Sequence, residues 1–169
     1  RPKEVSYSVY DPDAREWSPA KFLQMPDEER FRTAGSGCAQ RFDLEDGTIL
    51  LPLSYRANYE ESHATTVVAH CEFDGETLNL LGLGNSMTVA DPRGLGEPQL
   101  TRFGGRFFLS LRNDVRGYVA SSEDGLHFDE PTAWRFDDGE ELGNYNTQQH
   151  WLTHSGGLFL VYTRRGLDN

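Results

Sequence analysis

Three arginines are the residues of this chain whose type and spacing are best suited to binding a ligand. Arg56, Arg112 and Arg164 each end an apolar run, and successive members are 56 and 52 residues apart. A planar guanidinium group can hold a carboxylate through two parallel hydrogen bonds. In a chain with a net charge of −11, arginines placed so regularly are candidates for a funnel that binds an acidic ligand. Each of them could instead simply end its strand.

Glu97 is the candidate catalytic residue, because it opens the hairpin that Arg112 ends. A tyrosine hydroxyl, with an ordinary pKa of about 10, becomes a nucleophile when a carboxylate takes its proton. Two plainer interpretations stay open. Glu97 could be a solvated loop acid, and Arg112 could form an ion pair with Asp114.

The elements that must position these groups are short strands and tight turns. We expect a first set of strands at residues 38–44, 48–55, 65–73 and 77–81, and a second set at 99–103, 106–111, 117–121 and 132–136. Two further strands are expected at 148–153 and 158–163. The segment 18–23 carries helix signals but fits an outer strand equally well. The predicted fold class is therefore all-β.

A turn recurs in step with the arginines, at residues 13–17, 74–78 and 124–128. A period of roughly 50 residues made of short strands is typical of a β-propeller. We expect a single propeller domain over residues 1–169. Its parts are the end of one blade at 1–34, whole blades at 35–83 and 95–137, and the inner half of a further blade at 145–169.

This count predicts an incomplete arc of about three blades, whereas a closed ring needs about four to eight. An open arc would leave strand edges and apolar faces in water. We therefore expect the chain to be part of a longer protein, or to assemble with more of itself.

Polar residues near the start of the inner strands are candidates for contacts with a sugar, since these segments line the central cavity of a propeller. They are Gln40, Gln99, Gln148 and His150. Amide side chains supply both donors and acceptors for hydroxyl groups. Each of the four could instead be a satisfied polar residue of its strand.

The composition argues against several other classes of protein. With 27 acidic and 16 basic residues, the chain lacks the clustered cations that nucleic-acid binding requires. No apolar stretch is long enough to span a membrane, and no metal-ligand spacing or cofactor motif is present, so no metal or cofactor is expected. Cys38 and Cys71 are expected to be buried free thiols, although a disulfide between them is possible.

Two segments resemble the sialidase (neuraminidase) superfamily of β-propellers with BNR (Asp-box) repeats. Residues 122–128 are similar to the Asp-box, a structural turn in which the aspartate accepts backbone N–H groups and the glycine supplies a positive φ. Residues 96–112 are similar to the stretch in which a glutamate opens a hairpin and an arginine ends it. The resemblance implies that Glu97 polarises a nucleophilic tyrosine, expected beyond Asn169, and that Arg112 helps to clamp the substrate carboxylate.

The resemblance implies a secreted protein, extracellular or periplasmic, that is an exo-sialidase-like glycoside hydrolase acting on an acidic sugar. Arg56 and Arg164 would support Arg112 in binding it, and this chain alone is expected to be inactive. Two other functions stay open. One is a uronate polysaccharide lyase that uses His150, Tyr162 and Arg164 for proton transfer and charge neutralisation. The other is a non-catalytic propeller that binds glycan or protein.

Overall fold

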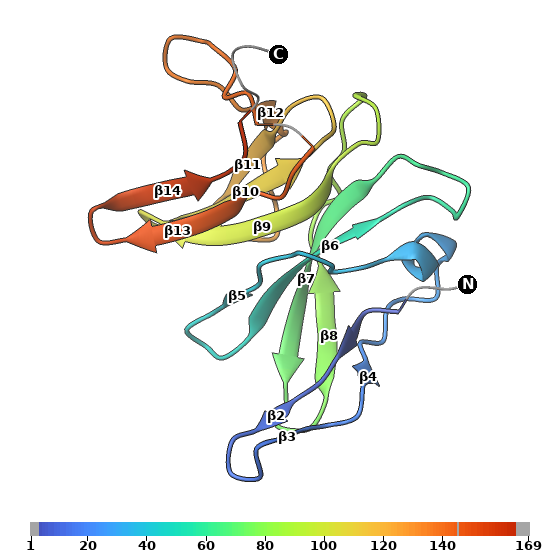
Figure 1. The fold of residues 1–169 in the computed structure, drawn as a ribbon. Coiled ribbons are helices and arrows are strands. Elements are labelled where there is room, and N and C mark those ends of the chain that lie inside the picture. Colours follow the sequence, from blue (N-terminus) through green and yellow to red (C-terminus); the bar gives the residue numbers. More distant parts are fainter. Residues whose placement is uncertain (1–3, 145, 165–169) are drawn as a thin grey trace.

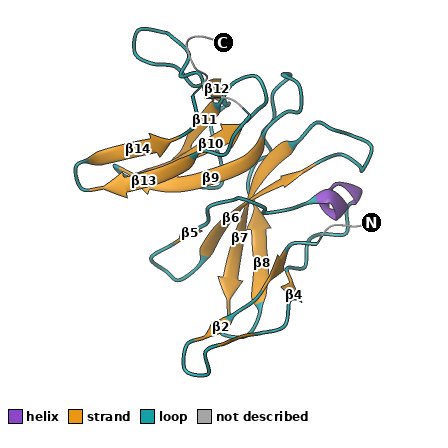
Figure 2. Cartoon of the chain, in the orientation of Figure 1, coloured by secondary structure: helices purple, strands orange, loops and turns teal. Residues whose placement is uncertain are grey.

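The computed structural model describes residues 4–144 and 146–164, which form small antiparallel sheets (Figure 1). The only helix in this part of the chain is the 3-10 helix η1, Glu29–Thr33 (Figure 2). The prediction of an all-β fold class is therefore confirmed. Over the same residues, no helix is long and apolar enough to cross a membrane.

The first four-stranded sheet follows the order of the chain. Its strands are β5 (Phe42–Asp43), β6 (Ile49–Tyr55), β7 (Thr65–Phe73) and β8 (Leu78–Leu83), each antiparallel to the next. The prediction of a strand at 65–73 is confirmed at both ends. The strand predicted at 38–44 is reduced to two residues. Cys38 is outside it because its backbone is left-handed (φ 62°), and the Leu44 N–H donates to the Thr48 carbonyl (2.8 Å) in the turn that follows.

The second four-stranded sheet repeats this order. Its strands are β9 (Gly96–Phe103), β10 (Arg106–Arg112), β11 (Tyr118–Ser122) and β12 (Thr132–Ala133). The strand predicted at 132–136 stops early, because the Phe136 N–H donates to the Glu140 carbonyl (2.8 Å) and so begins a separate turn. The two-stranded sheet of β13 (His150–His154) and β14 (Gly157–Val161) follows, as predicted.

The N-terminal segment forms one long hairpin, residues 5–23, here called the N-terminal hairpin. Its outgoing arm holds β1 (Ser6–Tyr7) and β2 (Tyr10–Asp11), and its returning arm holds β3 (Glu16–Trp17) and β4 (Lys21–Phe22). β1 pairs with β4 and β2 pairs with β3. Of the two interpretations of residues 18–23, the outer strand is therefore the right one.

The alternation of side chains along β6 and β7 divides the core into two layers. Leu50 and Val68 face the second sheet and pack in one cluster with Leu109. Their neighbours Leu53 and Val67 point the other way and pack with residues of the N-terminal hairpin. This period of two is the strand period, and it covers both faces of the first sheet.

The first strands of successive sheets lie side by side. β9 contacts β5 and β6 on one side and β13 on the other, and Gln40 forms a parallel bridge with Gln99. Trp151 on β13 donates its Nε1–H to the Gln99 carbonyl (2.8 Å), and its ring packs against that of Phe108 with centroids 6.2 Å apart. The first strand of each sheet therefore lies beside the first strand of the preceding sheet (Figure 1).

The recurring turns are held by aspartate carboxylates. Asp74 and Asp124 each accept the backbone N–H groups of the residues two and three positions further on. At the first turn the acceptor with this pattern is Asp11 and not Asp13, so the repeat begins two residues earlier than predicted. Arg15, four residues after Asp11, has a left-handed backbone (φ 57°), whereas in the other two turns the left-handed residue is the glycine directly after the aspartate.

Replacing Asp124 with alanine is expected to lower the free energy of unfolding by about 1–2 kcal/mol, because backbone N–H groups of the turn lose their acceptor. Burial alone would raise the pKa of this carboxyl, but hydrogen bonds from His127, Leu126 and Ser122 outweigh it and hold the pKa below its usual range. A carboxyl whose pKa is lower in the folded state stabilises the fold at neutral pH and loses this effect as the pH falls through the folded value. Urea denaturation at neutral and acidic pH measures both. The control is Asp138→Ala, at a turn where the carboxylate accepts one backbone N–H; equal losses in the two variants would contradict the prediction.

The two cysteines are free thiols, so the possible disulfide is not formed. Cys71 is buried as predicted, and burial raises the pKa of its thiol to about 11. Cys38 is exposed, contrary to the prediction, because its left-handed backbone takes it out of the strand in which it was placed.

Candidate functional site

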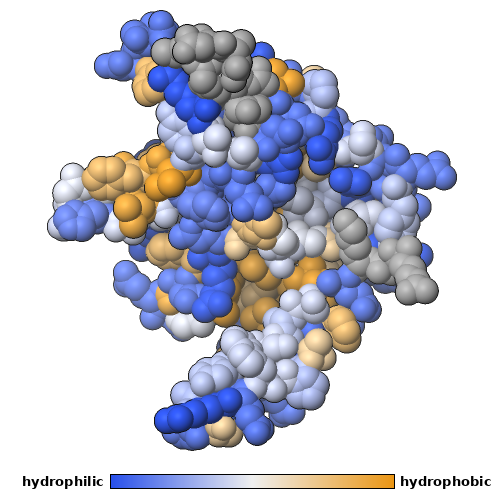
Figure 3. All heavy atoms as spheres, in the orientation of Figure 1, coloured by the Kyte–Doolittle hydropathy of each residue, from blue (hydrophilic) through white to orange (hydrophobic). Residues whose placement is uncertain are grey.

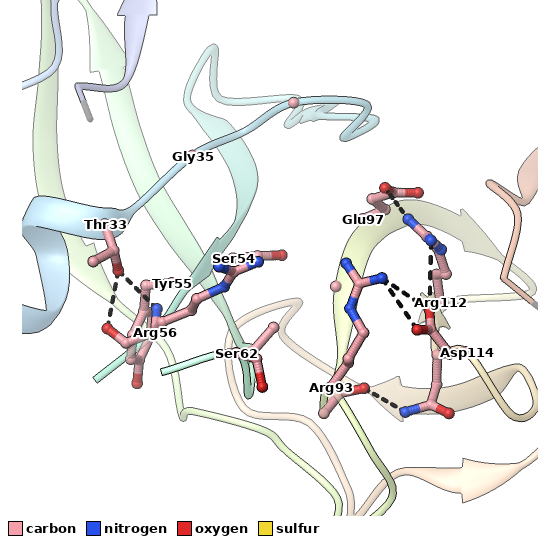
Figure 4. Close-up of a pocket in the computed structure, with 15 residues that line it drawn as sticks. Thr33, Gly35, Ser54, Tyr55, Arg56, Ser62, Arg93, Glu97, Arg112 and Asp114 are labelled. Atoms are coloured by element: carbon pink, nitrogen blue, oxygen red, sulfur yellow. Dashed lines mark hydrogen bonds and ion pairs between the residues drawn. The ribbon is translucent and has the colours of Figure 1, made fainter. Parts of the chain in front are cut away.

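A pocket of about 230 Å³ lies where the segments leading into β5 and β9 meet the ends of β6 and β10 (Figure 4). The charged residues of its lining are Arg56, Arg93, Glu97, Arg112 and Asp114. Three of these were candidates from the sequence: Glu97, Arg112 and Arg56. The fold therefore brings together residues that are up to 56 positions apart in the chain.

Arg112, the last residue of β10, is held by side chains from three segments. Its guanidinium group donates to Glu97 Oε1 and to Asn146 Oδ1, and it lies 3.5 Å from Asp114 Oδ1. The side chains of Arg112 and Glu97 are only 20% and 26% exposed. The interpretation of Arg112 as an ion-pair partner of Asp114 is confirmed, while its binding of a substrate carboxylate stays a prediction.

Arg93 was not among the candidates from the sequence, although it lies directly across from Arg112. It shares the Asp114 carboxylate, with Nη1 3.1 Å from Oδ2. The preceding Asp91-Pro92 pair predicts a loop, and nothing in the local pattern marks the arginine inside that loop as a ligand-binding residue. Only the fold, which places this loop beside the end of β10, assigns Arg93 to the pocket.

Arg56 enters the pocket from the opposite wall. Its backbone is fixed on both sides by one hydroxyl, because Thr33 Oγ1 accepts from the Arg56 N–H (2.7 Å) and donates to the Arg56 carbonyl (2.9 Å). In Figure 4 its side chain extends from this anchor toward Ser54 and the open space in front of Arg93. No carboxylate of the described residues lies within ion-pair distance of its guanidinium group.

The pocket therefore carries an excess of positive charge in a strongly acidic protein. Three guanidinium groups face two carboxylates, and both carboxylates are already paired with Arg112 or Arg93. Three buried polar atoms in the wall also lack a hydrogen-bond partner among the described residues: Glu97 Oε2, Arg112 Nε and Ser54 Oγ. Buried polar groups are nearly always hydrogen-bonded in folded proteins, so these three atoms are available to a ligand in the pocket.

Backbone strain gathers around the same pocket. Five residues other than glycine have a left-handed backbone in the described part of the chain. Arg93 (φ 67°) and Glu97 (φ 47°) line the pocket, Cys38 follows the lining residue Gly37, and Asn146 binds Arg112. The left-handed region costs a residue with a Cβ atom about 1–2 kcal/mol, and such strain is concentrated at functional sites.

The three candidate glutamines do not line this pocket. Gln99 is buried and donates its amide N–H to the Cys38 carbonyl. Gln40 is half-buried and bridges Gln99 through the backbone, while the Gln148 amide donates to Cys38 Sγ (2.7 Å). These glutamines therefore link the segments at the start of β5, β9 and β13.

His150 and Arg164 also lie outside the pocket. His150 is exposed on β13 opposite Val161, and the guanidinium carbon of Arg164 lies 5.8 Å from the centre of the Phe136 ring. Together with Tyr162, which is half-buried, these were the residues of the lyase hypothesis. They do not share the pocket of Arg56 and Arg112.

The pocket lining offers Glu97 no free tyrosine hydroxyl. The tyrosine that lines the pocket, Tyr55, donates its hydroxyl to Ser86 Oγ (2.8 Å) and accepts from Arg30 (3.2 Å), so its phenol is bonded elsewhere. Within residues 4–144 and 146–164, no three His, Cys, Asp or Glu side chains are grouped to hold a metal ion. The arrangement can bind an anion, and Glu97 supplies one carboxylate oxygen without a partner.

A scan against protein-family models finds no match to this chain, and a search of curated proteins finds none either.

Replacing Arg93 with alanine or with glycine separates its conformational strain from its role in the pocket. Both variants are expected to lose affinity for anions by about tenfold or more, because both remove one guanidinium group. The glycine variant should be more stable than the alanine variant by about 1 kcal/mol, since only glycine takes a φ of 67° without strain. Urea denaturation and calorimetric titration measure the two effects. Equal stability of the two variants would contradict the assignment of strain to this position.

Proposed function

We propose that this chain is part of a sialidase-type β-propeller that binds the carboxylate of an acidic sugar in the pocket of Arg56, Arg93 and Arg112. Three features support the propeller: two four-stranded sheets in chain order, first strands that lie side by side, and aspartate turns between the third and fourth strands. The observation that supports an acidic ligand is the Arg56 guanidinium group. It lies in a pocket with two other arginines, and no carboxylate of residues 4–144 and 146–164 forms an ion pair with it.

The chemistry of the pocket fits a sugar acid better than a larger anion. Its volume of about 230 Å³ is below the 300–1,000 Å³ that is typical of sites for drug-sized ligands, so the pocket suits a single sugar ring. Arg56 can offer a planar pair of donors to the carboxylate, and Arg93 adds a second positive charge. The hydroxyl groups of Ser54 and Ser62 in the lining can bind sugar hydroxyls.

The experiment that tests this proposal compares a sugar acid with its methyl ester. Calorimetric titration with N-acetylneuraminic acid and with glucuronic acid should show binding that weakens as salt is added, because the attraction is between charges. The methyl esters keep every hydroxyl but lack the charge, and they should bind at least about tenfold more weakly. Equal affinities for acid and ester would overturn the proposal.

Hydrolysis of a glycoside is the second candidate function, and the unpaired Oε2 of Glu97 in the pocket wall favours it. Glu97 would assist a nucleophile, and since the Tyr55 hydroxyl is bonded elsewhere, a tyrosine nucleophile would have to come from outside the pocket lining. Release of the phenol from an aryl sialoside, and its loss in Glu97→Gln, would support hydrolysis. Binding of the sugar acid without any release would leave a binding protein.

A further inference from the structure

The N-terminal hairpin and the β13–β14 hairpin correspond to complementary halves of a four-stranded sheet. In both complete sheets an aspartate turn joins the third strand to the fourth, at Asp74 and at Asp124. The N-terminal hairpin has the same turn at Asp11, so it corresponds to a third and fourth strand. The hairpin of β13 and β14 follows β12 and lies beside β9, so it corresponds to a first and second strand.

Each half has one strand edge with which the other half could pair. In the complete sheets the second strand pairs with the third, as β6 does with β7 and β10 with β11. Among residues 4–144 and 146–164, β14 pairs only with β13, and the arm that holds β1 and β2 pairs only with its own return arm. Such edges present unpaired backbone N–H and C=O groups and pair readily with another strand.

The β13–β14 hairpin also has an apolar face without a cover. Trp151 packs on the second sheet, whereas the opposite face carries Leu152, Phe159 and Val161, which are 57%, 49% and 58% exposed. Figure 3 shows a hydrophobic patch over the β13–β14 hairpin, on the left. The faces that join neighbouring sheets elsewhere in the molecule are covered by such side chains.

A groove of about 470 Å³ lies beside the N-terminal hairpin. One wall is the outgoing arm of the hairpin, from Val5 to Tyr10, and the floor includes Ile49 and Leu51 of β6. These floor residues lie on the face of the first sheet where a preceding sheet would pack its first and second strands. The groove thus lies where the first and second strands of a sheet completed by the N-terminal hairpin would pack.

We propose that the groove binds the β13–β14 hairpin of a second copy of this chain, and that the same exchange in the other direction closes a ring of two copies. β14 of one copy would pair with residues 6–11 of the other, and Leu152 and Phe159 would cover Ile49 and Leu51. Two complete sheets and one shared sheet per copy would give six sheets, within the range of about four to eight that closed propellers use. This inference rests on the propeller proposed above but not on its ligand.

The test is the mass of the purified chain in solution, measured by light scattering over a dilution series without any sugar. We expect twice the 19.1 kDa of the single chain, and a larger dimer fraction at higher salt, because each copy has a net charge of −11. Phe159→Glu should give a folded monomer, as judged by circular dichroism, since this side chain is exposed within one copy. The matched control is Leu81→Glu, on an exposed position of β8, which should remain dimeric.

Three outcomes would overturn the inference: a monomeric wild type at every concentration, a dimer that persists in folded Phe159→Glu, or assemblies larger than two copies. In the first case the groove would be covered by some other segment or partner. Because the measurement uses no ligand, each of these outcomes leaves the proposal for the sugar acid to be judged by its own titration.

Discussion

Replacing Arg56 with glutamine is expected to weaken the binding of a sugar acid by about 10- to 100-fold while leaving the stability of the fold nearly unchanged. A charge-assisted hydrogen-bonded pair contributes about 1.5–3 kcal/mol to binding. The fold should tolerate the change, because no carboxylate of the described residues depends on Arg56 as an ion-pair partner. Thr33 fixes Arg56 only through its backbone, and that anchor remains in the variant. Titration calorimetry and thermal unfolding measure the two quantities.

The matched control is Arg135→Gln, which removes an equal charge from a surface ion pair with Glu141. Its effect on binding should be within about twofold of the wild type, since surface charges far from a site are screened by salt. A similar loss in both variants would mean that net charge, and not the pocket, controls the affinity.

Replacing Gly94 with alanine is expected to lower the free energy of unfolding by about 2–4 kcal/mol, the largest loss of stability that we predict for the pocket wall. Gly94 has a φ of +63°, and an added Cβ would lie 2.1 Å from the Ala64 carbonyl oxygen. The obstacle is backbone, which cannot rotate away as a side chain would. The left-handed strain contributes about 1 kcal/mol and the overpacking about 1–3 kcal/mol. Urea denaturation measures the sum.

The control for Gly94 is Gly104→Ala, because Gly104 has a similar φ of +57° but no atom within 4 Å of an added Cβ. This variant should lose only the strain, about 1 kcal/mol. The difference between the two variants measures the close approach of the loop around Arg93 to residue 64. Equal losses would show that the loop can move away, and that Arg93 is not held as the structure has it.

Much of the fold could be predicted from the sequence because its strands carry strong local signals. The β-branched run at 65–73 and the turns at Asp74 and Asp124 follow from side-chain periodicity and turn chemistry, which need no knowledge of distant residues. The errors have local causes as well. Cys38 has a left-handed backbone that no strand pattern reveals, and the first turn has no glycine after its aspartate, Asp11, to mark where it begins.

The site could be predicted only where a residue ends or begins a strand of the repeat. Arg56, Glu97 and Arg112 occupy such positions, and all three line one pocket. Arg164 shares the pattern but lies against Phe136 instead, so the period alone does not place a side chain. Arg93 lies in a loop between two sheets, and no period of the sequence reaches it. The positions of Arg93 and Arg164 depend on contacts between sheets. Such contacts follow no periodic pattern in a single sequence.

The most direct test of the sugar-acid pocket is a crystal structure of the protein with N-acetylneuraminic acid bound. We predict that the carboxylate lies within hydrogen-bonding reach of the Arg56 and Arg93 guanidinium groups, in the pocket beside Glu97. A sugar bound with its carboxylate directed to solvent, or bound in the groove of the N-terminal hairpin and not in this pocket, would contradict the account.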